Sequence, residues 1–192
     1  NKETDIVFVA DMFVEDYVGG AELTTEALIK SATDVVVQKV HARNVSMSTL
    51  SSGVDKHWVF CNISSLQPTL MPSIIANLSY SVIEYDYKFC KYRSIEKHLQ
   101  EAGEECDCHN DIHGKMITAF FHAAKSLWWM SEAQEKRYLE RFPFLRENDS
   151  VVLSSVFDDN FFAYVNSVNQ QNKDTERKGW IVLGSQSWIK GY

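Results

Sequence analysis

Cysteine and histidine side chains gather in one short segment of the sequence, between residues 90 and 113. Cys90, His98, Cys106 and Cys108 follow the spacing C-x7-H-x7-C-x-C, in a chain that has four cysteines among its 192 residues. Thiolate sulfur and imidazole nitrogen are ligands that tetrahedral Zn²⁺ prefers in proteins. The segment therefore predicts a metal site. Its role would be structural, because four protein ligands leave no coordination position open for water or substrate.

The same residues allow other arrangements. His109 or His113 could replace one of the four metal ligands. Without a metal, the thiols would be free and buried, or Cys90 would form a disulfide bond with Cys106 or Cys108. A stable disulfide bond is less expected in the cytoplasm. The spacing does not decide between a structural metal, free thiols and a disulfide bond.

Carboxylates lie at the carboxyl ends of two of the predicted strands. Glu84 and Asp86 lie in the segment EYDY, and alternate residues of a strand face the same side. If they border a cleft, these carboxylates could accept hydrogen bonds from the hydroxyl groups of a sugar acceptor or act as a catalytic base. The alternative is that they are exposed or helix-capping acids without a catalytic role. Ser131 and Glu132 end a later strand and could contact a sugar. Ser131 is equally suited to capping the next helix, with Glu135 near position N3.

Gly19 and Gly20 separate an apolar run from a segment of helical periodicity. In an open α/β sheet, a glycine turn that leads into a helix N-terminus lets backbone N–H groups meet a phosphate. The pair therefore predicts a phosphate site, and the alternative is a tight turn without a ligand. The G-x-G-x-x-G spacing is absent, which argues against an NAD-linked dehydrogenase.

Apolar runs alternate with helical patterns along most of the chain. Strands are predicted at residues 5–14, 34–40, 56–63, 79–87, 126–131 and 150–157. Helices are predicted at 21–32, 72–79 and 113–125, and from 132 to near Pro143. This alternation favours an α/β fold, with a Rossmann-like, open, mostly parallel sheet covered by helices on both faces.

Composition excludes some classes of protein. The net charge of −7 and the isoelectric point near 5.4 argue against nucleic-acid binding, because phosphate contacts need clustered Lys and Arg. Apolar residues make up 45% of the chain, enough for a core, yet no apolar run reaches the roughly 20 residues of a transmembrane helix. No cleavable leader precedes the first strand. We therefore expect a cytoplasmic protein without a transmembrane segment.

A polar segment divides the predicted domains. Residues 166–178 contain one apolar side chain and are predicted to be a linker. Residues 1–165 would form a Rossmann-like domain, with a Cys/His-rich insertion at 90–113. Residues 179–192 would be the first strand of a second, truncated domain.

An ordered series of motifs resembles the N-terminal half of a glycosyltransferase of the GT-B fold. The motifs are VGGAE, LWWMSEAQ, VVLSSVF and WIVLGSQSWIKG, and the resemblance spans most of residues 5–191. It implies two Rossmann-like domains facing across a cleft, with the acceptor mainly on the first and the nucleotide-sugar mainly on the second. The implied reaction transfers a sugar from a nucleotide-sugar to a glycan or other acceptor, as in polysaccharide biosynthesis.

The resemblance also implies roles for single residues. Gly19 and Gly20 would lie near the donor phosphates, and Lys190 matches the basic residue of a KG motif that contacts the donor diphosphate. The histidine that many relatives carry after the fourth strand has no counterpart in IEYDYKFC. Transfer in this fold is usually independent of metal, so Zn²⁺ here would be structural.

Two functions are consistent with the sequence. In the first, the chain is the acceptor-side part of a nucleotide-sugar-dependent glycosyltransferase, and we expect residues 1–192 alone to transfer no sugar. In the second, it is a stand-alone Rossmann-like binding module with a structural metal site and no catalytic activity. A hydrolase is not supported, because no G-x-S-x-G motif is present.

Overall fold

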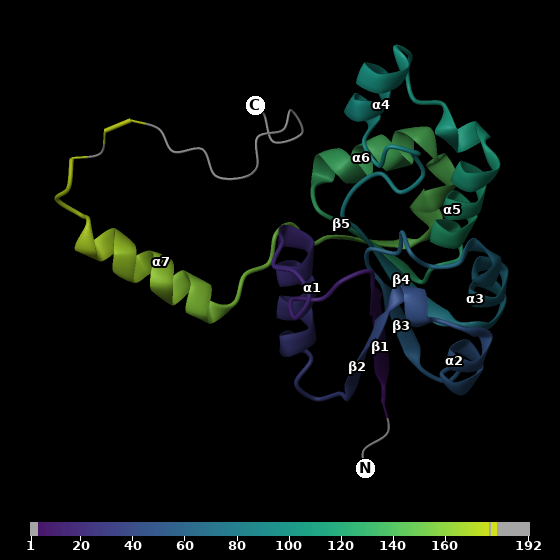
Figure 1. Cartoon of the computed structure of the whole chain (residues 1–192), viewed down its shortest axis with the longest axis horizontal. Helices are drawn as coiled ribbons and strands as arrows, with labels where there is room; N and C mark the ends of the chain where they lie inside the picture. The colour runs from purple at the N-terminus through teal and green to yellow at the C-terminus, as the bar shows by residue number, and fades with distance from the viewer. Residues whose placement is uncertain (1–3, 177, 180–192) are drawn as a thin grey trace. The chain divides into compact units, whose positions relative to one another are not determined.

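Six parallel strands form one open sheet in the computed structural model, which describes residues 4–176 and 178–179 (Figure 1). The strands are β1 (Ile6–Ala10), β2 (Val37–His41), β3 (His57–Phe60), β4 (Ser79–Glu84), β5 (Ser126–Trp129) and β6 (Asp149–Val152). Their order is β2-β1-β3-β4-β5-β6, and every neighbouring pair is parallel. The predicted α/β fold with a Rossmann-like, open parallel sheet is confirmed.

The strand order decides which helices cover each face. The helices of this part are α1 (Gly20–Ser31), α2 (Met47–Ser52), α3 (Met71–Asn77), α4 (Ile95–Ala102), α5 (Ile112–His122) and α6 (Glu132–Arg141). The connection from β1 to β2 runs one way across the sheet and the later connections run the other way. Right-handed crossovers therefore place α1 on one face and α2, α3, α5 and α6 on the opposite face (Figure 1). Helix α4 lies beyond the carboxyl ends of the strands.

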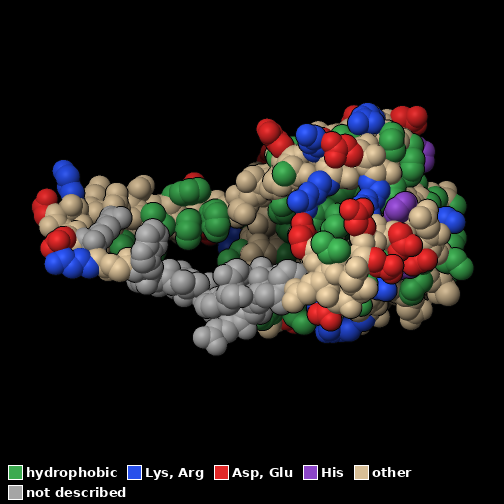
Figure 2. Space-filling view, turned by 90° about the horizontal axis from the view of Figure 1, so that it is seen from above, with side chains coloured by type: hydrophobic (Ala, Val, Ile, Leu, Met, Phe, Trp, Pro, Cys, Tyr) green, Lys and Arg blue, Asp and Glu red, His purple; other side chains and the backbone are tan. Residues whose placement is uncertain are grey.

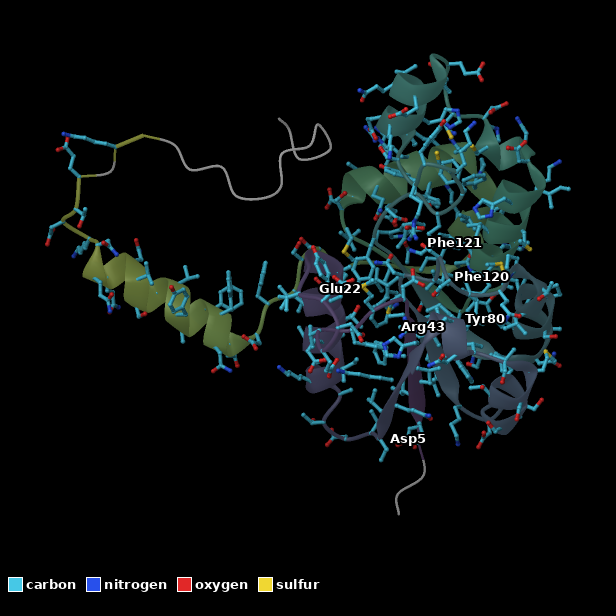
Figure 3. The ribbon with its side chains drawn as sticks, viewed as in Figure 1. Asp5, Glu22, Arg43, Tyr80, Phe120 and Phe121 are labelled. Carbon is cyan, nitrogen blue, oxygen red and sulfur yellow. The ribbon has the colours of Figure 1, made fainter. Side chains whose placement is uncertain are left out.

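The core has two layers because side chains of a buried strand alternate between its faces. In β1, Val7 and Val9 face the larger layer, whereas Phe8 and Ala10 face the smaller layer beneath α1. The larger layer is rich in aromatic rings, and Tyr80 and Phe120 stack with ring centroids 4.9 Å apart (Figure 3). The Tyr80 hydroxyl, although buried, donates a hydrogen bond to the Phe120 carbonyl at 2.6 Å.

Several elements differ from the predictions in extent. The first strand ends at Ala10, whereas the prediction extended it to residue 14. The Asp11 carboxylate accepts hydrogen bonds from the backbone N–H groups of Ser64 and Ser65, so it joins the loops after β1 and β3. Helices α2 and α4 were not predicted, because neither has a long apolar face.

The chain divides into two units, up to Val156 and from Phe157 onward. In the second unit, α7 (Asp159–Gln171) is capped by Asp158, whose side chain accepts from the Phe161 N–H. Residues 166–171, which we assigned to a linker, are therefore helical. The predicted strand of a second domain, residues 179–192, and with it Lys190 lie outside the described residues, apart from position 179.

Among the described residues, no helix combines the length and the apolar character that crossing a membrane requires. On the face seen in Figure 2, basic and acidic side chains are interspersed and do not form a basic stripe. This distribution is the one that we expect for an acidic protein.

We predict that Phe60→Ala lowers the free energy of unfolding by about 3–5 kcal/mol. Phe60 is fully buried against the rings of Tyr80 and Phe120, so its truncation leaves a cavity. Urea denaturation measures the change. Phe144→Ala is the matched control because Phe144 is partly exposed, and equal losses for the two variants would contradict the assigned core.

Candidate metal centre

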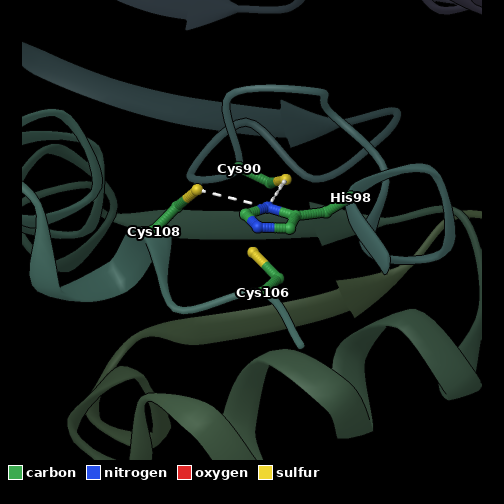
Figure 4. A group of neighbouring side chains, drawn as sticks. All are labelled: Cys90, His98, Cys106 and Cys108. Carbon is green, nitrogen blue, oxygen red and sulfur yellow. Dashed lines mark hydrogen bonds between the residues drawn. The ribbon is translucent and has the colours of Figure 1, made fainter. Parts of the chain in front are cut away.

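The structure brings together the four side chains of the predicted metal site. One ligand atom from each of Cys90, His98, Cys106 and Cys108 lies within 4.8 Å of the others (Figure 4). His98 Nδ1 is 3.5 Å from the Cys90 sulfur and 3.4 Å from the Cys108 sulfur. All four side chains are buried. A buried Cys₃His cluster of this kind could hold a metal ion.

The spacing of the donor atoms suits tetrahedral coordination. Zn–S bonds of about 2.3 Å and Zn–N bonds of about 2.0–2.1 Å imply S···N edges of about 3.6 Å. The two distances at His98 are close to that edge. All separations lie within 4.8 Å, against an ideal S···S edge of about 3.8 Å, so binding a metal would draw the thiols closer together. The donor set is thus closed and fits Zn²⁺.

Cys90 is held by a tight turn after β4. Its N–H donates to the Tyr87 carbonyl at 2.9 Å, and its carbonyl accepts from the Arg93 N–H at 2.8 Å. Arg93 adopts a left-handed backbone conformation with φ of 56°, which a residue with a side chain rarely adopts. Ser94 then caps α4 by accepting from the Lys97 N–H. The turn therefore directs Cys90 inward and starts the helix that carries His98.

Helix α4 contacts the rest of the molecule through His98, through Ile95, which packs against the core, and through Glu96, which pairs with Arg137 at 2.6 Å. His98 is 1% exposed and is the one buried residue of this eight-residue helix, whereas Leu99 is 52% exposed. Gly103 ends the helix in the left-handed conformation with φ of 72°. Because α4 buries little apolar surface, a bond from His98 to a metal would add to its attachment.

Cys106 and Cys108 are positioned from the other side of the cluster by α5 and α6. An added Cβ at Gly114 of α5 would overlap the Cys108 carbonyl oxygen and lie 2.8 Å from the His109 Cα, so only glycine permits this approach. Arg141 of α6 donates to the Cys106 carbonyl at 2.6 Å. Two packed helices thus fix the backbone that bears these two thiols.

Burial keeps the Cys106 thiol protonated in the absence of a cation. Burial, together with the neighbouring thiols Cys90 and Cys108, raises the pKa of Cys106 to about 12. A bound divalent cation reverses this balance because a coordinating thiol loses its proton. All four cysteines of the chain are free in the structure, so no disulfide bond is formed.

The candidate base Glu84 lies in the interior. It is 1% exposed, its Oε1 is 3.0 Å from Lys88 Nζ, and its Oε2 accepts from the Tyr138 hydroxyl at 2.8 Å. Burial raises the pKa of Glu84 to about 7, more than Lys88 lowers it. Asp86 follows the end of β4, so strand alternation no longer applies, and its Oδ2 pairs with Arg93 Nε at 2.7 Å. A catalytic role for either carboxylate stays a prediction, and the depth of Glu84 argues against contact with an acceptor.

Ser131 caps α6, which is one of the two roles predicted for it. Its Oγ accepts from the Gln134 N–H at 3.1 Å. Position N3 is therefore occupied by Gln134 and not by Glu135, and Gln134 Oε1 accepts from the Met130 N–H. Glu132 begins the helix with an exposed side chain. Contact of either residue with a sugar stays a prediction.

The glycine pair lies at the carboxyl edge of the sheet, after β1 and at the start of α1. Gly19 is the N-cap, with an extended backbone and no side-chain cap. A Cβ at Gly19 would lie 2.5 Å from Glu22 Oε2 and 2.7 Å from Tyr17 Cε1, whereas a Cβ at Gly20 would meet nothing within 4 Å. The space beside Gly20 is therefore open, and the space beside Gly19 is filled by the chain itself.

Basic side chains that the sequence pattern did not indicate also lie at this edge. Lys88, Arg93 and His113 converge near Cys90, and the His113 Nε2–H donates to the Lys88 carbonyl at 3.0 Å when that nitrogen carries the proton. For Lys88, the sequence did offer an indication. Lys88 lies four residues after Glu84, a spacing at which opposite charges can pair. His113 and His109 are not among the four clustered ligands.

Comparison with known proteins gives no match to a family model and no curated protein of significant similarity. The function must therefore be inferred from the residues and their geometry.

We predict that Gly114→Ala reduces metal binding and lowers the free energy of unfolding by about 1–3 kcal/mol, because its methyl group would push the Cys108 backbone away. Metal analysis and thermal melting measure the two effects. Gly20→Ala adds the same methyl group at a helix start with open space and should retain metal content. Wild-type metal content in Gly114→Ala would contradict the assigned packing.

We predict that Glu84 makes the protein less stable as pH rises from about 4.5 to 7. Its folded pKa exceeds the ordinary value of 4.5, so the folded state holds the proton more tightly across that range. The expected loss is on the order of 3 kcal/mol. The double variant Glu84→Gln/Lys88→Met removes both charges and should lack this loss in urea denaturation at a series of pH values. Identical pH profiles for the two proteins would contradict the prediction.

Proposed function

We propose that this chain is the acceptor-side domain of a nucleotide-sugar-dependent glycosyltransferase, with Zn²⁺ as a structural ion. The observation that carries the zinc assignment is the buried cluster of Cys90, His98, Cys106 and Cys108. Three thiols and one imidazole form a donor set typical of structural zinc. The four protein ligands would fill the tetrahedral site and leave no position for water. The ion would therefore stabilise the fold and would not supply a bound hydroxide.

The transferase assignment is supported by the motif series and by where the fold brings its loops. In parallel α/β sheets, ligands bind beyond the carboxyl ends of the strands. The loop that ends at Gly19 and the loop from Tyr87 to Arg93 both follow carboxyl ends of central strands. Sugar donor and acceptor would meet at this edge, with the donor diphosphate near the N-terminus of α1.

The protein's contribution to transfer would be to bind and orient the acceptor and to stabilise the charge that develops on the leaving diphosphate. Backbone N–H groups at the start of α1 can donate to that charge. Glu22 lies over this turn, so a phosphate would have to displace its carboxylate. The zinc would act at a distance by fixing the loop that follows β4.

A second candidate is a binding module without catalytic activity, stiffened by the same metal. It is favoured by one observation: the sheet, the cluster and the loops around it all lie within the unit that ends at Val156. The two candidates share the metal and differ in whether a nucleotide-sugar is consumed.

We predict one zinc ion per chain in protein purified without chelator, measured by elemental analysis. Cys106→Ser and His98→Ala should each reduce the zinc content well below one, because each removes a ligand. Cys61→Ser is the matched control, since Cys61 is a buried free thiol outside the cluster. Absence of zinc and of other transition metals from the wild-type protein would overturn the metal assignment.

The transferase proposal is tested by release of nucleoside diphosphate from a panel of nucleotide-sugars, using the protein as its gene encodes it. Gly20→Val should reduce turnover at least tenfold with little change in melting temperature, because the side chain enters space that is open in the fold. Ala21→Val, the neighbouring helix position, is the control for helix propensity. Absence of turnover with every donor would favour the binding module.

A further inference from the structure

A cavity of about 190 Å³ lies beside the loop that follows β4 and carries Cys90. It is lined by the segments that follow β3 and β4 and by the start of α5. Its floor is apolar and includes Leu66, Met71 and Ile117. The volume is below the roughly 300–1,000 Å³ of sites for drug-sized ligands, so the cavity suits a single sugar-sized group. It opens at the carboxyl edge of the sheet, where α/β proteins bind their ligands.

Basic side chains line this cavity, although the chain as a whole carries a net charge of −7. They are Lys88, Lys91, Arg93 and His113; the other ionisable group of the lining is the Cys90 thiol, and no carboxylate is among the described residues of the lining. The Lys88 charge is balanced by Glu84. In the part of the chain that the structure describes, Lys91 has no carboxylate partner, and its Nζ lies 5.2 Å from the centre of the Tyr92 ring.

Arg93 retains donors for a ligand. Its Nε lies 2.7 Å from Asp86 Oδ2 and its Nη2 donates to Asn62 Oδ1 at 3.0 Å, so the guanidinium is fixed while other N–H groups remain. The left-handed backbone of Arg93 carries strain that persists only where surrounding contacts enforce it, and such strain gathers at ligand sites. The contacts that enforce it belong to the turn that also holds Cys90.

We propose that this cavity binds an oxyanion, carboxylate or phosphate, carried by a sugar-sized acceptor. Lys91 and Arg93 donate to the anion, and the apolar floor receives the face of the ring. That the ligand is a sugar acceptor rests on the proposed transferase function. The metal would then support the anion site, because its candidate ligand Cys90 lies in the same turn as Lys88, Lys91 and Arg93.

The test is calorimetric titration of the zinc-loaded 192-residue protein with glucuronate, glucose 6-phosphate, glucose and inorganic phosphate. We expect one of the two anionic sugars to bind at least tenfold more tightly than glucose, and the tighter one identifies the anion. Equal binding of glucose and both anionic sugars, or binding of none, would overturn the proposal. Inorganic phosphate binding as tightly as glucose 6-phosphate would also overturn it, because the site would then serve free anions.

Variants separate binding from folding. Lys91→Gln should weaken the anionic sugar about tenfold, as expected for a lost charge-assisted hydrogen bond, whereas Lys136→Gln, at an exposed lysine outside the lining, should not. Arg93→Gly suits the left-handed backbone and should keep the zinc while weakening binding at least tenfold. Unchanged affinity in Lys91→Gln and Arg93→Gly would overturn the assignment.

The titration does not depend on sugar transfer, so the two proposals can fail separately. Binding of an anionic sugar, together with absence of nucleotide-sugar turnover by the protein as its gene encodes it, would overturn the transferase and leave the anion site. Turnover of a donor with neutral acceptors alone would support the transferase and overturn the anion site.

Discussion

The loop that follows β4 depends on how its buried thiols and imidazole are satisfied. Cys90, His98, Cys106 and Cys108 are removed from water, and the segment between them buries few apolar side chains. Without a metal, the thiols Cys90 and Cys108 have only long hydrogen bonds of 3.4–3.5 Å, and His98 Nε2 has no hydrogen-bond partner among the described residues. A divalent cation would convert this unfavourable cluster into the strongest set of bonds in the loop. The position of α4, the turn at Arg93 and the cavity beside it would all follow from that coordination.

A second polar cluster lies next to the first and ties the loop to the sheet. Glu84 at the end of β4 contacts Lys88 and the Tyr138 hydroxyl of α6, and the Asp86 N–H donates to Glu84 Oε1. A buried ion pair of this kind adds little net stability over an apolar replacement, yet it strongly restricts how its neighbours can lie. We interpret it as the support of the loop, since it fixes the chain between the end of β4 and Cys90.

The sequence allowed the parallel sheet and the cluster of candidate metal ligands to be predicted, because both depend on local patterns. Apolar runs such as that of β1 mark buried strands, and Cys106 and Cys108 are close along the chain. Strand ends were less predictable, since β1 stops where Asp11 finds partners 53 and 54 residues away. The burial of Glu84 was also hidden, because its partner Tyr138 comes from a distant helix. The cavity could not be anticipated at all, since it joins residues from three separate segments.

The most direct test of this account is hydrogen exchange of the protein with zinc bound and after zinc is removed by a chelator. If the metal holds the loop, backbone amides of residues 90–111 will exchange at least tenfold faster without zinc, whereas those of β1, β3 and β4 will keep their protection. Equal exchange of residues 90–111 in the two states would contradict the claim that metal coordination fixes this loop and the cavity beside it.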